Sequence, residues 1–149
     1  RTTMYQKLLI AIDPKDDNEA KFALATAISM LPKDGELHLA SIYSPADSGF
    51  FPYVTSVAPE QKEAEVKESL DLLVHKYLPF NHNVSLYVVA GSAGETLVDL
   101  AGQLCADLLI LVSRGSNGHW PLRKATVEYI SVNAPCHVLV LPLLEKTAS

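Results

Sequence analysis

The sequence predicts an α/β fold in which a five-stranded parallel sheet carries helices on both faces in a doubly wound arrangement. Two observations lead to this prediction. Short apolar runs alternate along the chain with segments whose apolar residues recur at helical spacing. The runs are apolar at successive positions rather than at every second one, which is typical of strands buried on both faces of a parallel sheet.

The amino-terminal half is predicted to contain two strands and two helices. Residues 7–13 are apolar from Leu8 onwards and end in Asp13, which predicts the first strand. Asp16 precedes Glu19 by three residues, the spacing of a capping box, so we expect a helix to begin there. The ranges predicted in this half are strand 7–13, helix 16–31, strand 36–43, and a helix that begins at Pro59 and ends before Pro79.

The carboxyl-terminal half continues the alternation with three strands and two helices. Ser92 and Glu95 repeat the capping-box spacing, and apolar residues follow them on one helical face. A polar loop separates the fourth strand from a short last helix, and Pro135 ends that helix. The predicted ranges are strand 84–89, helix 92–105, strand 107–112, helix 126–132 and strand 137–141.

Length, charge and cysteine content limit the classes of protein that fit. We expect one domain over residues 4–142, preceded by three residues ahead of a natural start at Met4 and followed by a tail at 143–149. A net charge of −5 disfavours binding to nucleic acid, and no apolar stretch is long enough to cross a membrane. Two cysteines without CxxC spacing favour a reducing compartment, so a cytoplasmic location is expected.

Common catalytic and metal-binding motifs are absent from the sequence. It contains no GxGxxG, no GxxxxGK[ST], no GxSxG and no HExxH, and its histidines show no metal-ligand spacing. A phospho-receiver would need an acceptor aspartate where the third strand instead ends in Ala90 and Gly91. We therefore predict neither catalytic residues nor a metal site, and the protein is not expected to be an enzyme.

The most informative stretches are residues 106–115 (ADLLILVSRG), residues 125–126 (AT) and residues 133–141 (NAPCHVLVL). They resemble the universal stress protein family, whose members carry an Ala-Asp-Leu-Ile strand, then G-x2-G-x9-G-[S/T], then Ala-Pro-Cys-Pro-Val-Leu-Val-Val. The likeness extends to the first predicted strand and to Gly91 with its following Glu-Thr-Leu. It implies a Rossmann-like fold of the adenine nucleotide alpha hydrolase type.

The resemblance also implies an ATP site. The aspartate that ends the first strand would contact adenosine, an apolar residue late in the second strand would pack near adenine, and the glycine loop would hold the ribose and phosphates. Glycines and a helix amino terminus suit such a role because backbone N–H groups can approach an anion there. The implied cofactor-binding residues are Asp13, Ile42, Val112, Arg114, Gly115, Ala125 and Thr126.

This chain departs from the family motif at two of its three glycine positions, which hold Val112 and Ala125. We expect these side chains to crowd the phosphate region, and a β-branched residue at 112 would be strained if that position needs a positive φ. The resulting prediction is a non-catalytic stress-response protein with weak or absent ATP binding. The alternatives are an ATP-binding switch that uses the degenerate loop at 112–126, and, third, an ATP-hydrolysing enzyme.

Two predictions concern partners. Family members commonly dimerise through the last strand, so we expect a homodimer through the apolar residues 137–141, and further protein partners of unknown identity. The long loop at 44–58 holds an aromatic cluster at 50–53. This loop is a candidate lid or partner surface, or it packs on its own domain.

Overall fold

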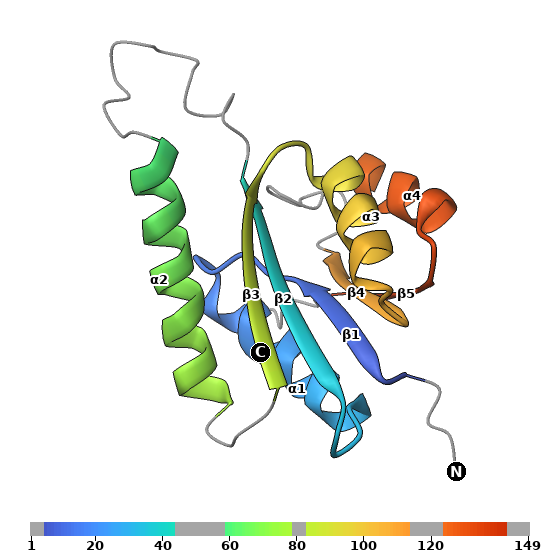
Figure 1. Cartoon of the computed structure of the whole chain (residues 1–149), viewed down its shortest axis with the longest axis horizontal. Coiled ribbons are helices and arrows are strands. Elements are labelled where there is room, and N and C mark those ends of the chain that lie inside the picture. Colours follow the sequence, from blue (N-terminus) through green and yellow to red (C-terminus); the bar gives the residue numbers. More distant parts are fainter. Residues whose placement is uncertain (1–4, 44–58, 79–82, 114–123, 143–149) are drawn as a thin grey trace, which may run out of the picture.

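The computed structural model describes residues 5–43, 59–78, 83–113 and 124–142. Within these residues strands and helices alternate as predicted (Figure 1). The elements are β1 (Lys7–Ala11), α1 (Asp17–Met30), β2 (Glu36–Tyr43), α2 (Pro59–Tyr77), β3 (Asn83–Ala90), α3 (Ala93–Leu104), β4 (Leu108–Ser113), α4 (Lys124–Asn133) and β5 (His137–Pro142). The predicted loop at 44–58 lies outside the described residues.

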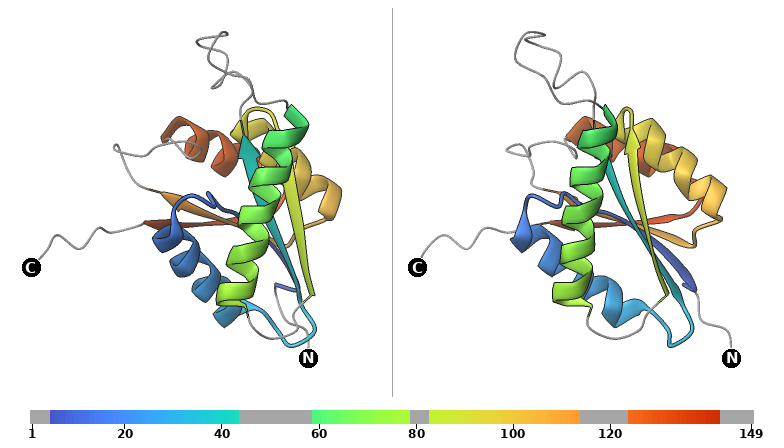
Figure 2. Two further views of the ribbon diagram at one scale, coloured as in Figure 1. Left: turned by 90° about the vertical axis from the view of Figure 1, so that its left-hand side faces the viewer. Right: turned by 60° about the vertical axis from the view of Figure 1, so that its left-hand side comes forward.

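All five strands form one parallel sheet in the order β3-β2-β1-β4-β5, which confirms the predicted doubly wound fold. The chain moves outward from β1 through β2 to β3, and then crosses to the other side of β1 to add β4 and β5. Because right-handed crossovers in opposite directions place their helices on opposite faces, α1 and α2 cover one face and α3 and α4 the other (Figure 2).

The two faces of the sheet carry separate cores, because successive strand residues point to opposite sides. Alternate residues of β1 divide between them: Leu8 and Ile10 pack under α1 and α2, whereas Leu9 and Ala11 pack under α3 and α4. All four are at most 2% exposed. The unbroken apolar runs in the sequence are therefore explained by burial on both faces.

Some strand ends differ from the prediction. β1 ends at Ala11, two residues before Asp13, because the Asp13 N–H bonds to the Glu19 carboxylate rather than to a neighbouring strand and the chain then turns. β4 begins at Leu108 rather than at Asp107, whose carboxylate instead accepts a backbone hydrogen bond. α4 begins at Lys124, two residues earlier than predicted.

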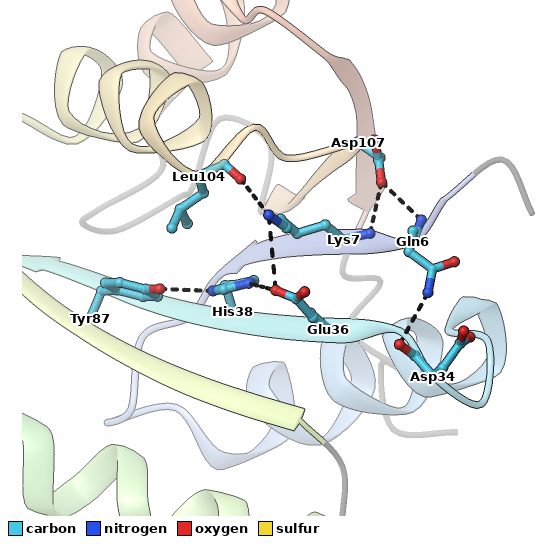
Figure 3. Close-up of polar contacts among 8 residues, drawn as sticks. All are labelled: Gln6, Lys7, Asp34, Glu36, His38, Tyr87, Leu104 and Asp107. Carbon is cyan, nitrogen blue, oxygen red and sulfur yellow. Dashed lines mark hydrogen bonds and ion pairs between the residues drawn. The ribbon is translucent and has the colours of Figure 1, made fainter.

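Polar side chains hold the amino ends of the central strands (Figure 3). The Asp107 Oδ2 atom accepts the backbone N–H of Lys7 at 2.8 Å, which ties the start of β1 to the start of β4. His38 is 6% exposed within β2, with its Nδ1 atom 2.8 Å from the Tyr87 hydroxyl and its Nε2 atom 3.1 Å from a Glu36 carboxylate oxygen. His38 is therefore a strand residue whose two ring nitrogens both have hydrogen-bond partners.

The carboxyl ends of β1 and β4 separate at the point where the winding direction reverses. Their ladder runs from the pair Leu8 and Leu108 to the pair Ile10 and Ile110. β4 continues alongside β5 as far as Ser113, while β1 has already ended. In doubly wound folds ligands bind outside the carboxyl ends of the strands at this switch point.

Candidate functional site

Four of the predicted site residues lie in segments that meet the carboxyl edge of the sheet at the switch point. Asp13 follows β1, Val112 is near the end of β4, and Ala125 and Thr126 lie in the first turn of α4, which returns from that edge. Arg114 and Gly115 lie outside the described residues. The structure thus brings the two ends of the predicted site, the Asp13 turn and the start of α4, to one edge of the sheet.

Asp13 lies in a tight turn whose backbone groups are paired. Its Oδ1 atom accepts the backbone N–H of Lys15 at 3.0 Å, and its carbonyl oxygen accepts the N–H of Asp16 at 3.1 Å. Its own N–H donates to the Glu19 Oε2 atom at 3.1 Å. An aspartate that bonds to the backbone two residues on is a common turn-forming device. The turn presents Asp13, half-buried, just beyond the end of β1.

The first predicted capping box is only half formed. Asp16 is the N-cap of α1 and accepts the backbone N–H of Glu19 at 3.0 Å, as predicted. The Glu19 side chain, however, bonds to the N–H of Asp13 and not to that of Asp16. The Asp16 N–H instead bonds to the Asp13 carbonyl of the preceding turn.

Glu19 is the residue of this edge whose importance the sequence did not reveal. Its side chain is among the buried residues of α1, and the residue is only 4% exposed. Burial raises the pKa of Glu19 to about 7, the hydrogen bond from the Asp13 N–H opposes this, and the nearby Asp13 charge raises the pKa further. The available signal was its position directly before Ala20 on the apolar face of α1.

The structure does not bring Ile42 and Val112 together, because they belong to opposite faces of the sheet. Ile42 packs in the core under α3 and α4, whereas Val112 packs in the core under α1 and α2, the one that includes Ile12. Each is 1% exposed.

The strain considered for a β-branched residue at position 112 is not present. Val112 is paired with Leu141 in the β4–β5 ladder, and Cys105 is the one described non-glycine residue with a positive φ. The predicted obstacle to ATP binding is therefore only steric. The Val112 side chain fills space in the core beside the switch point. Ala125, by contrast, is exposed at the start of α4, so its methyl group fills no core space.

Gly91, another residue of the family likeness, is required by its backbone. Its φ is +152°, and a Cβ atom built there would lie 2.6 Å from the Thr96 Oγ1 atom.

The second predicted capping box, of Ser92 and Glu95, is wrong in detail. The Ser92 hydroxyl donates to the Glu95 carboxylate at 3.1 Å, and no side-chain bond caps the α3 backbone. A serine hydroxyl can donate a hydrogen bond to a nearby carboxylate instead of accepting one from a backbone N–H of the helix.

The described part of the chain contains neither a candidate metal site nor a candidate membrane-spanning helix. No group of three or more histidine, cysteine, aspartate or glutamate side chains there is placed to hold a metal ion. None of the helices in that part is both long and apolar enough to cross a membrane.

Several solved structures share this architecture. The protein MJ0577, described as a hypothetical protein in a structural-genomics study, has a TM-score of 0.75 at 19% identity, over 96% of this chain and 99% of that one. The universal stress protein UspA from Lactobacillus plantarum has a TM-score of 0.65 at 22% identity, over 92% and 97%. A universal stress protein in complex with cAMP has a TM-score of 0.54 at 20% identity, over 93% and 97%.

At these identities the structural likeness establishes the fold and not the ligand. The comparison with curated protein sequences finds no relative. The sequence model of the universal stress protein family, however, matches residues 4–142, which is nearly the whole chain. This chain belongs to the universal stress protein family.

Proposed function

We propose that the chain is a non-catalytic stress-response protein that binds ATP weakly or not at all and works as a homodimer in the cytoplasm. The supporting observation for weak ATP binding is Val112. It stands at the first glycine position of the family motif, and its side chain is 1% exposed in the core at the end of β4. A phosphate held by backbone N–H groups needs close approach to the chain, which glycine permits and valine obstructs.

The test is to restore the two glycines with Val112→Gly and Ala125→Gly together. We expect the double variant to bind Mg-ATP more tightly than wild type, measured by isothermal titration calorimetry. Val84→Gly, which removes the same side chain at the amino end of β3, is the matched control and should not change ATP affinity. If the double variant is poorly folded, Val112→Ala with Ala125→Gly serves instead. Unchanged ATP affinity in a folded double variant would contradict the proposed obstruction.

The alternative function, an ATP-binding switch, has support of its own. The Asp13 turn is fully hydrogen-bonded at the switch point, and α4 begins there with Thr126 in its first turn, so a helix dipole could favour a phosphate. A related structure is described as a complex with cAMP. This function predicts a thermal shift of the wild-type chain with Mg-ATP that Gly115→Asp abolishes. If millimolar ATP produces no thermal shift of the wild-type chain, the ATP-binding switch is rejected.

The homodimer is proposed through β5, an edge strand of the sheet. Its apolar residues Val138, Leu139, Val140 and Leu141 are only half-buried, and the strand pairs with β4 on one side. Unpaired apolar edges favour association with a second strand. Sedimentation of the chain as a monomer at micromolar concentration would refute the dimer.

The cytoplasmic location is inferred from the two free thiols, Cys105 and Cys136, which suit a reducing compartment.

A further inference from the structure

We propose that Tyr87 is a covalent acceptor site: its hydroxyl is a nucleophile that His38 activates and Glu36 helps to orient, and it takes electrophiles of the activated acyl or sulfonyl type. Glu36 and His38 lie near the amino end of β2, and Tyr87 lies on the neighbouring strand β3, away from the switch point (Figure 3). The inference is therefore independent of the nucleotide binding proposed above, and its failure would leave that proposal unchanged.

The three side chains form one continuous chain of hydrogen bonds. The Nδ1 atom of His38 lies 2.8 Å from the Tyr87 hydroxyl oxygen, and its Nε2 atom lies 3.1 Å from Oε1 of Glu36. A carboxylate has no hydrogen to donate, so Nε2 carries the ring proton and Nδ1 presents a lone pair to the Tyr87 hydroxyl. The hydroxyl thus donates to a base that is itself oriented by an acid, which is the arrangement that activates hydroxyl nucleophiles.

The imidazole in the middle of this chain is held in one orientation. His38 is 6% exposed, and the centre of its ring lies 5.6 Å from that of Tyr87 at an interplanar angle of 31°. Beyond the carboxylate, the Lys7 Nζ atom lies 4.0 Å from Glu36 and donates to the Leu104 carbonyl at 2.9 Å. Because both ring nitrogens are bonded within a nearly buried site, the imidazole stays directed at the Tyr87 hydroxyl.

The tyrosine end of the chain faces the more open side. β3 is an edge strand, and Ser85 pairs with His38 in the β2–β3 ladder. Because alternate strand residues share a face, Asn83, Ser85 and Tyr87 all lie on the face that carries His38. Asn83 and Ser85 are exposed and Tyr87 is half-buried. The residue beside the imidazole is therefore small and accessible to water, and we expect a small reagent to approach the Tyr87 hydroxyl along this face.

The covalent step balances between the site and the electrophile. The Tyr87 oxygen attacks the acyl carbon or sulfonyl sulfur, and the bond from that atom to its leaving group breaks, so that the leaving group departs with the electron pair. The phenolic proton passes to Nδ1 of His38, and the Glu36 carboxylate stabilises the imidazolium that forms. Proton transfer to a positioned base accelerates such steps by roughly 10²–10⁴-fold in enzymes, so an acceleration of at least about tenfold is a modest expectation here.

The experiment measures how fast each tyrosine of the folded chain reacts with an arylsulfonyl fluoride, which leaves a stable sulfonate ester and releases fluoride. Peptide mass spectrometry quantifies the product at each site. Tyr129 on α4 is the internal reference, because it is 41% exposed whereas Tyr87 is half-buried. If exposure alone governs the reaction, Tyr129 is labelled faster. If His38 acts as a base, Tyr87 is labelled faster.

In wild type we expect Tyr87 to be labelled at least about tenfold faster than Tyr129. His38→Gln keeps an acceptor for the Tyr87 hydroxyl but is not a base, so this preference should disappear. Glu36→Gln keeps an acceptor for the imidazole N–H but has no charge to stabilise the imidazolium, so the Tyr87 rate should fall several-fold. Glu68→Gln, which changes an exposed glutamate of α2, is the matched control and should leave the rate unchanged.

Two results would overturn the proposal. The first is a wild-type chain in which Tyr129 reacts as fast as Tyr87, since the hydrogen bonds around His38 would then be structural only. The second is a Tyr87 rate that is unchanged in folded His38→Gln, with circular dichroism as the check of folding. If His38→Gln does not fold, Glu36→Gln takes its place, because its side chain is 44% exposed in wild type and its replacement disturbs little packing. An unchanged Tyr87 rate in Glu36→Gln would then overturn the proposal.

Discussion

Glu19→Gln should change how the stability of this protein depends on pH. The carboxyl group of Glu19 is almost completely buried, so its ionised form is less favourable in the folded chain than in the unfolded one. Its pKa is about 7 when folded, against an ordinary value of 4.5. Between these two values the folded state binds more protons than the unfolded state, so the free energy of unfolding falls as pH rises.

The size of this effect follows from the two pKa values. The folded pKa lies about 2.5 units above the ordinary 4.5, and each unit corresponds to about 1.4 kcal/mol. Stability from this group is therefore fully present below about pH 4.5, is lost between about pH 4.5 and pH 7, and is lower by about 3 kcal/mol above that window. Glutamine cannot ionise, so the variant should lack this loss.

Urea denaturation of wild type and Glu19→Gln across that pH range measures the difference in unfolding free energy directly. Taking the difference at each pH cancels the other titrating groups and any constant cost of the amide. We expect the variant to gain about 3 kcal/mol relative to wild type from the acidic to the neutral end. The exposed control Glu68→Gln should show almost no such trend. A constant difference between wild type and Glu19→Gln would refute the reasoning.

Three further predictions concern backbone positions and use the same urea assay. Gly91→Ala should destabilise the fold by about 2 kcal/mol, because φ is +152° and the new Cβ would lie 2.6 Å from the Thr96 Oγ1 atom; a neutral result would contradict this. Gly94→Ala should stay within about 0.5 kcal/mol of wild type, since its Cβ would meet the Tyr129 ring at 3.0 Å but that ring is 41% exposed and able to shift, while alanine favours the helix. Cys105→Gly should stabilise by about 1 kcal/mol, because Cys105 caps α3 in the left-handed conformation at φ 55°; a loss of stability would show that its side chain has another role.

The location of the candidate site could be predicted from the sequence, but its internal arrangement could not. An acid after the first strand and a degenerate glycine loop after the fourth are both visible as local patterns, and parallel topology brings them to one edge. Arg114 and Gly115 lie outside the described residues, so their part in the site remains a prediction. The sequence pattern could not show that Ile42 and Val112 lie on opposite faces of the sheet. Which face each residue takes depends on how its strand is aligned with its neighbours and with the covering helices.

The sequence by itself determined the order of strands and helices, the parallel sheet and the family, because each depends on periodicity or on residues close together in the chain. The tertiary structure decided that the Glu19 carboxylate accepts the Asp13 N–H. In the sequence, Glu19 follows Asp16 by three residues, and this spacing also fits a capping box in which Glu19 bonds to the Asp16 N–H. Packing of α1 against the sheet buries the side chain behind the Asp13 turn, where its carboxylate accepts the Asp13 N–H, while the Asp16 N–H bonds to the Asp13 carbonyl. Which of two local hydrogen bonds forms is settled by burial, and burial depends on contacts that the local sequence does not contain.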